Sequence, residues 1–249
     1  MGLQAADFIV ILVAAFAPSL IYLVWMRNSE RFEKEPYGRL LRVFFIGGAL
    51  VSVVVAIILE SLLLDLLNQN IDRVYLLFGE NPNVTTLLLA CVIAPFVEEL
   101  AKSYGVFRVR RFMREVEDGI VYGAAAGLGF AATENLFYES DAFLTTGAEA
   151  FILTAVLRTL SSALLHASAS SVMGLGIARG ALEGKGWLKY YFGAVFMHSM
   201  FNLAASSGPI LEGDYGESAY LFGLAAAFLI AIGGIWTVRA KVRTLEGRL

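Results

Sequence analysis

Seven long apolar segments, separated by short polar connections, make up most of the chain. A membrane-spanning helix needs about 20 consecutive, mostly apolar residues. The segments of that length are Ala5–Met26, Leu40–Leu67, Val84–Phe107, Asp118–Tyr138, Ala150–Arg179, Trp187–Ser206 and Ser218–Val238. The pattern predicts an all-α, polytopic membrane protein with about seven transmembrane helices, in a single integral membrane domain that covers residues 1–249.

The composition agrees with this pattern. Hydrophobic residues make up 58% of 249 positions and charged residues 16%, whereas soluble domains are about a quarter charged. The mean hydropathy is +0.69. The single cysteine, Cys91, excludes an intramolecular disulfide. The first basic residue is Arg27, so we expect the first segment to be a retained span and not a cleaved signal peptide. No nucleotide-binding loop is present, and the expected surroundings are a lipid bilayer without nucleic acid.

Basic residues alternate between the connections and predict the orientation. The first, third and fifth connections and the C-terminus are rich in Lys and Arg, the second holds only Arg73, and the fourth and sixth hold none. Cytoplasmic connections of membrane proteins carry the excess of Lys and Arg. The N-terminus is therefore predicted outside and the C-terminus in the cytoplasm, in a multi-pass protein of a prokaryotic plasma membrane.

Two adjacent carboxylates interrupt the third apolar segment. Glu98 and Glu99 are followed by Lys102 at helical spacing, so the lysine can pair with either glutamate. A charged side chain at the centre of a bilayer costs roughly 3 kcal/mol. Such groups therefore face a protein interior, a partner or a water-filled cavity.

The only two histidines lie at a matching depth. At about 1.5 Å per helical residue, Glu98 and Glu99 lie about 14–15 Å from the basic border of their span, His198 about 13 Å and His166 about 20 Å. Ser170 and Asn202 follow the two histidines by four residues and share their helix faces. This arrangement predicts one polar site inside the membrane, with a catalytic core in the third to sixth helices, about residues 84–206.

Three polar residues in the outer half allow two interpretations. Glu134 and Asn135 lie about 24 Å up the fourth span by helical rise, and Arg158 lies in the outer half of the fifth. Glu134 either pairs with Arg158 or completes the site, which would require a tilted or broken fourth span. Glu60, near the outer end of the second span, is expected at the membrane interface.

The residues of this cluster suit hydrolysis by two routes. Carboxylates and neutral imidazoles are zinc ligands, and a bound metal makes water acidic enough to be a nucleophile near neutral pH. Without metal, a glutamate beside a histidine could activate water, while His198 and Asn202 stabilise the oxyanion. Which of Glu98 and Glu99 contacts the water is left open. Rival functions are an ion- or proton-coupled transporter using the same groups and a non-catalytic membrane scaffold.

The ordered motifs resemble those of the PrsW family of intramembrane proteases. The resemblance lies in Glu98-Glu99-Leu-Ala-Lys102, Glu134-Asn135-Leu-Phe-Tyr138, His166 with Ser170 and Gly174, and His198-Ser-Met-Phe-Asn202, and it extends to the N-terminal region around Glu35-Pro36. The family is similar to the wider Abi/CAAX-protease group.

The resemblance implies a membrane-anchored protein substrate and, in the family's best-known case, site-1 cleavage of an anti-sigma factor. It implies that Glu98, Glu99, His166 and His198 are catalytic, with support from Lys102, Glu134 and Asn202. From their positions beside these residues, Asn135, Arg158 and Ser170 are expected to be supporting residues as well. The family is usually classed with metallopeptidases, so zinc is the expected cofactor, with Glu99, Glu134, His166 and His198 as candidate ligands.

Overall fold

The computed structural model describes residues 4–81 and 83–247, and all secondary structure in these two ranges is helical. The helices in chain order are α1 (Ala5–Arg27), α2 (Tyr37–Arg42), η1 (Val43–Ser52), α3 (Val53–Gln69), α4 (Ile71–Phe78), α5 (Val84–Leu88), η2 (Leu89–Ile93), α6 (Ala94–Val109), η3 (Arg110–Phe112), α7 (Val116–Thr145), α8 (Ala148–Leu160), α9 (Ser162–Glu183), α10 (Leu188–Ala205), α11 (Ser207–Tyr215) and α12 (Ser218–Glu246). Several of them continue into one another without a loop, as α2, η1 and α3 do.

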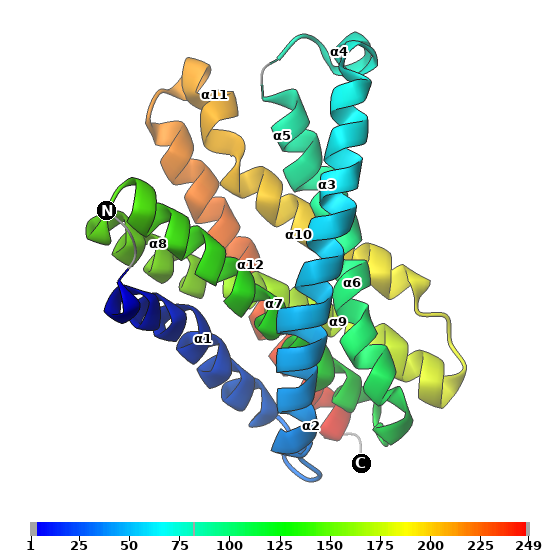
Figure 1. Cartoon of the computed structure of the whole chain (residues 1–249). Coiled ribbons are helices and arrows are strands. Elements are labelled where there is room, and N and C mark those ends of the chain that lie inside the picture. Colours follow the sequence, from blue (N-terminus) through cyan, green and yellow to red (C-terminus); the bar gives the residue numbers. More distant parts are fainter. Residues whose placement is uncertain (1–3, 82, 248–249) are drawn as a thin grey trace.

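The helices form one bundle around α7 and α9. In Figure 1 the hairpins built from α3 to α5 and from α10 to α12 extend upward to α4 and α11, while α1 and α8 lie across the left side. Helix α2 and the end of α12 lie together at the lower end. Residues 117–132 of α7 are all buried, because other helices surround this part of it.

Small residues let α7 and α9 approach closely. A methyl group added at Gly123 would collide with the backbone of Ser170 and Ser171, and one at Gly127 with the backbone of His166. Small residues at helix contacts are the common means of close packing inside membranes, where no hydrophobic effect drives helices together. This contact fixes the height of His166 against α7.

The structure contains a helical segment for each of the seven predicted spans. Within the described ranges, five segments are long and apolar enough to cross a membrane: Ala5–Arg27, Tyr37–Gln69, Val84–Phe112, Ala148–Glu183 and Ser218–Glu246. The two remaining segments are α7, which neighbouring helices enclose, and α10, which carries His198 and Asn202. A helix that faces protein on all sides does not need the apolar surface that lipid requires. Multiple membrane crossings are thus supported, and the count of seven stays a prediction.

The third and fifth segments are distorted near the polar residues. The segment that contains Pro95 has a π-helical stretch, Leu89–Ile93, just before the proline. A proline has no N–H to donate to the preceding turn, so local widening of the helix is expected there. The fifth segment breaks at Ser161, where α8 ends and α9 begins. The hydroxyl of Ser161 donates to the carbonyl of Leu157 at 2.7 Å and so competes with the helical backbone.

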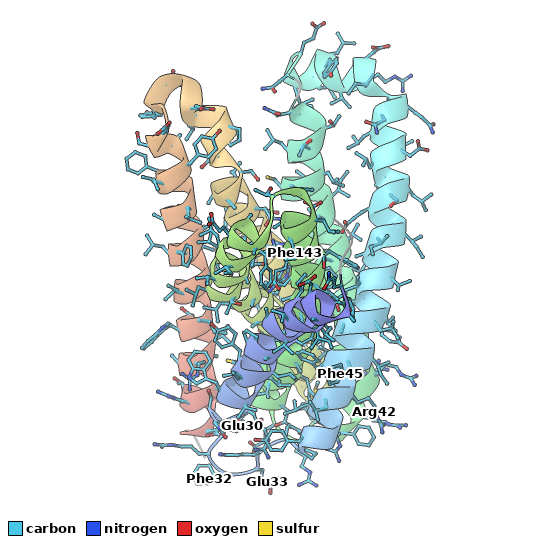
Figure 2. All side chains as sticks on the ribbon, turned by 60° about the vertical axis from the view of Figure 1, so that its left-hand side comes forward. Glu30, Phe32, Glu33, Arg42, Phe45 and Phe143 are labelled. Carbon is cyan, nitrogen blue, oxygen red and sulfur yellow. The ribbon has the colours of Figure 1, made fainter. Side chains whose placement is uncertain are left out.

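A buried acidic group lies in the connection between α1 and α2. Figure 2 shows Glu30 at the lower end of the molecule, above Phe32 and Glu33. One oxygen of Glu30 accepts the backbone N–H of Glu35 at 3.0 Å, and the other is buried without a hydrogen-bond partner. Burial raises the pKa of Glu30 from 4.5 to about 8, and burial also raises the pKa of Glu35, whose carboxylate accepts a hydrogen bond from Tyr122. Glu30 therefore keeps its proton at neutral pH in the folded protein.

Replacing Glu30 with Gln should flatten the dependence of stability on pH. The unfolded chain releases the Glu30 proton near its ordinary pKa of 4.5, whereas the folded protein holds it up to about pH 8. Wild-type stability should therefore fall as the pH rises between these two values and level off above them. Glu30→Gln never ionises and its amide oxygen can still accept the Glu35 N–H, so it should exceed the wild type in stability at pH 8. Thermal unfolding in detergent from pH 5 to pH 9 measures this, and parallel curves for the two proteins would contradict it.

Candidate active site

Five ionisable side chains from three helices meet in the interior of the bundle. Glu98, Glu99 and Lys102 come from α6, His166 from α9 and His198 from α10. All five are buried: Glu99 is 0% exposed and Lys102 1%. The structure thus brings together the acidic pair and both histidines, as their matching depths predict.

Both carboxylate oxygens of Glu99 accept hydrogen bonds. Its Oε1 accepts from Lys102 Nζ at 2.7 Å and lies 3.0 Å from His198 Nδ1. Its Oε2 accepts from the hydroxyl of Ser170 at 3.0 Å. Because Lys102 and Ser170 both donate to it, Glu99 is a fixed acceptor that holds three side chains from three helices in place.

Glu98 has a different environment. Its Oε2 forms an ion pair with Lys102 Nζ at 3.1 Å, but the geometry is not that of a hydrogen bond, and this buried oxygen has no hydrogen-bond partner. It also lies 3.9 Å from His166 Nδ1 and 3.9 Å from His198 Nε2. Glu98 therefore directs an oxygen without a hydrogen-bond partner toward the space between the two imidazoles.

Hydrogen-bond partners determine which nitrogen of each histidine carries the proton. Since Glu99 can only accept, His198 Nδ1 donates to it, which leaves the lone pair of Nε2 free on the side of Glu98. Since Lys102 can only donate, His166 Nδ1 accepts from it at 2.8 Å, and His166 Nε2 donates to Glu134 at 2.9 Å. Neighbouring charged groups thus orient both imidazoles.

Glu134 satisfies both interpretations that the sequence leaves open. The same oxygen, Oε2, accepts from Arg158 Nη2 at 2.6 Å and from His166 Nε2. Arg158 also donates to Asn135 at 2.7 Å and to Ser162 at 3.1 Å. Helix α7 is continuous here, and the break that accompanies this contact lies between α8 and α9. The ion pair and the site are parts of one network.

Asn202 has a role that the sequence pattern did not indicate. Its Nδ2 donates to the carbonyl of Ala90 at 2.7 Å, in the π-helical stretch before Pro95. A π-helical turn would pair that carbonyl with the N–H of residue 95, which proline lacks. Asn202 supplies the missing donor and ties α10 to the distorted segment. Its predicted contact with an oxyanion stays a prediction.

Phe130 of α7 also borders the site. The ammonium of Lys102 lies 4.4 Å from the centre of its ring, and the ring of His166 lies 5.4 Å away. An aromatic face stabilises a desolvated cation, so Phe130 adds to the environment of Lys102. A single phenylalanine in an apolar helix carries no sequence signal for this function.

One group of side chains could hold a metal ion. The ligand atoms of Glu98, His166 and His198 lie within 4.8 Å of one another. Two imidazoles and one carboxylate are a suitable set of three protein ligands for catalytic zinc, and the unpartnered Glu98 oxygen fits this use. Lys102 contacts His166 Nδ1, so its ammonium would have to move toward Glu99 to make room for a second cation. Glu99 and Glu134 each contact a histidine from the outside of this group.

These features define a class of protein: a helical membrane protein with a buried glutamate and histidine centre of the type that carries out hydrolysis. The model of the "PrsW family intramembrane metalloprotease" matches residues 35–232. The chain therefore belongs to the PrsW family of intramembrane proteases and is a multi-pass bacterial membrane protein.

Individual relatives support this assignment. Protease PrsW of Geobacillus kaustophilus is 28% identical over 240 residues, which cover 94% of this chain and 91% of the relative. Protease PrsW of Bacillus subtilis is 30% identical over 175 residues, 68% of this chain and 69% of the relative. No solved structure matches the chain significantly.

Proposed function

We propose that this chain is an intramembrane endopeptidase that hydrolyses a peptide bond of a membrane-anchored protein. The observation that carries the proposal is the convergence of Glu98, His166 and His198 from three helices at one buried point. The relatives named Protease PrsW support an enzyme of this kind. The resemblance to the family further supports a single-span regulator of the anti-sigma-factor type as substrate, cut at site 1.

The proposed topology has seven spans, with the N-terminus outside and the C-terminus in the cytoplasm. The basic residues of α2 and of the last turn of α12 support it, because both elements lie at the same end of the molecule. The short arginine-rich η3 follows α6 toward that end. An accumulation of Lys and Arg at one end of a bundle marks the cytoplasmic side. Helices α7 and α10 would be the two remaining spans.

In the proposed route without metal, Glu98 is the general base. Its free oxygen can accept a proton from a water molecule held between the two imidazoles, and it can return that proton to the leaving amine. His198 presents the lone pair of Nε2 toward the same point. Glu99 keeps that imidazole in the required tautomer, and Glu134 does the same for His166. Burial keeps bulk water out, so each of these interactions is stronger than it would be in solution.

We propose zinc as the cofactor. Glu98, His166 and His198 would hold it, and Glu98 would then be a ligand, whereas it is the general base only in the route without metal. When bound there, zinc lowers the pKa of a coordinated water toward about 7. Glu99 and Glu134 then act on the ligands from outside, as the partners that orient metal-bound histidines do in other proteins. This differs from the ligand set expected from the resemblance, in which Glu99 and Glu134 contact the metal directly.

Metal content and cleavage measured on the same preparations test the proposed function. Wild-type protein purified in detergent without chelators should hold about one zinc per chain and should cleave tagged single-span proteins in proteoliposomes. His166→Ala/His198→Ala should lose both properties, whereas Cys91→Ser, which removes the only thiol, should keep both. Absence of cleavage by zinc-loaded wild type, with every single-span protein tried, would contradict a protease. Cleavage without metal would leave the glutamate route, with His198 and Asn202 as oxyanion donors.

A further inference from the structure

Glu60 lies on the inner face of α3 and not on the lipid-facing side. Val53 and Ala56 of this helix pack against Val97 and Phe130, and Leu63 packs against the same cluster. Residues spaced by three or four positions share one face of a helix, so Glu60 belongs to the stripe that contains Ala56 and Leu63. The sequence pattern predicts the height of Glu60, near the membrane interface. It does not predict the direction in which this side chain points.

The carboxylate of Glu60 is uncommitted. Its Oε1 is buried and has no hydrogen-bond partner. Among the described residues, no Lys, Arg or His nitrogen lies within 4.0 Å of it. Phe130, which packs in the same cluster as Ala56 of this stripe, lies 4.4 Å from the ammonium of Lys102, so Glu60 is placed at the edge of the Glu/His cluster. Burying a carboxylate oxygen without a partner is costly, so a cation beside Glu60 would stabilise its ionised form.

The cations of the cluster already have partners. Lys102 is held by Glu99 and His166, and Arg158 by Glu134 and Asn135. Counted together, the four carboxylates of Glu60, Glu98, Glu99 and Glu134 face two permanent cations. A zinc ion at Glu98 would reduce this excess without supplying Glu60 with a partner of its own.

The cluster reaches the surface on the side where Glu60 lies. The side chains of Glu134 and Arg158 are 23% and 18% exposed, whereas those of Glu98, Glu99, Lys102 and both histidines are at most 7% exposed. Tyr138, which is half exposed, stacks with Arg158 at 3.9 Å. We call the partly exposed group of Glu134, Arg158 and Tyr138 the mouth of the site. Helix α3, which carries Glu60, adjoins α7 beside this group through Ala56 and Phe130.

We propose that Glu60 is a specificity-determining residue that binds a lysine or arginine side chain of the substrate at the mouth of the site. The proposal rests on the proposed function, since it assigns a substrate feature to the same site. The ammonium or guanidinium group of the substrate supplies the cation that Glu60 lacks. Pairing inside a partly desolvated mouth favours a basic side chain over a neutral one, because the neutral one leaves the carboxylate unpaired.

A panel of matched reporters tests this proposal. Each tagged single-span reporter carries one Lys, or Gln at the same position, placed successively along the half of its span nearer to α4. In proteoliposomes the wild type should cleave the best Lys reporter about tenfold or more better, in kcat/KM, than its Gln counterpart. Glu60→Gln should remove this preference, and Glu60→Lys should turn it toward a Glu reporter. Asp65→Asn should keep it, because that exposed carboxylate on the same helix is already bonded to Gln69.

Two results would overturn the role of Glu60. One is a preference for the Lys reporter that survives in Glu60→Gln. The other is an equal fall in kcat/KM for the Lys and Gln reporters in Glu60→Gln, which indicates a structural role. Binding separates this proposal from the proposed function. Photo-crosslinking of the Lys reporter to Glu98→Gln should fall about tenfold in Glu60→Gln/Glu98→Gln even if no variant cleaves anything. Equal crosslinking by the two proteins would refute the assignment of Glu60 independently of catalysis.

Discussion

Glu98→Gln should abolish cleavage while leaving the fold intact. A positioned general base contributes about 10²–10⁴-fold to a rate, so kcat should fall by that factor, with a much smaller change in KM. The amide is nearly isosteric, and the oxygen that it replaces accepts no hydrogen bond in the folded protein. Thermal stability in detergent should therefore be equal to or above that of the wild type. Steady-state cleavage of a single-span reporter in proteoliposomes, together with thermal unfolding, measures both effects.

Glu99→Gln and Glu139→Gln are matched controls for this result. Glu99 accepts from Lys102, Ser170 and His198, so its neutralisation should lower both the stability and the rate. Glu139 of α7 is equally buried, and both of its oxygens lack hydrogen-bond partners, but it does not contact the cluster. Its replacement by Gln should leave cleavage unchanged. Wild-type activity in Glu98→Gln, or a loss in Glu139→Gln equal to that in Glu98→Gln, would disprove Glu98 as the base.

The sequence was sufficient to predict that the buried glutamates and histidines lie together. Charged and imidazole groups inside apolar spans are so costly that they must meet one another, and the spacing from each basic border gives their height. Glu98, Glu99, His166 and His198 indeed meet at one point. The helical segments were also predictable, because their length and apolar composition follow from the thickness of a bilayer.

The contacts between helices could not be predicted in the same way. Lys102 bridges Glu99 and His166 because α6 packs against α9, and Gly127 lets α7 approach the backbone of His166 from another side. Asn202 donates to the carbonyl of Ala90, 112 residues away, because Pro95 lacks the N–H that would bond to this carbonyl. The direction of Glu60 depends on how α3 turns toward α6. Such contacts arise from packing between distant segments, and periodicity along one segment contains no information about them.

Lys102→Met should destabilise the protein strongly. The Lys102 ammonium is 1% exposed and lies 2.7 Å from Glu99 and 3.1 Å from Glu98. Removing it leaves two buried carboxylates without their cation, and breaking a buried ion pair in this way costs about 3–5 kcal/mol. For a chain of this size the midpoint of thermal unfolding should fall by roughly 10 °C. Thermal unfolding of the detergent-solubilised variant measures the loss.

The exposed pair of Lys185 and Glu183 provides the comparison that isolates burial. Its nitrogen and oxygen also lie 2.7 Å apart, but the side chains are 57% and 33% exposed. Lys185→Met should therefore lower the midpoint of thermal unfolding far less than Lys102→Met does. Adding Glu99→Gln to Lys102→Met should restore part of the lost stability, because it removes one of the unpaired charges. If Lys102→Met were no more destabilising than Lys185→Met, the ammonium would not be the group that holds the acidic pair together. Glu99 would then need another source of positive charge, and the bound metal would be the first candidate.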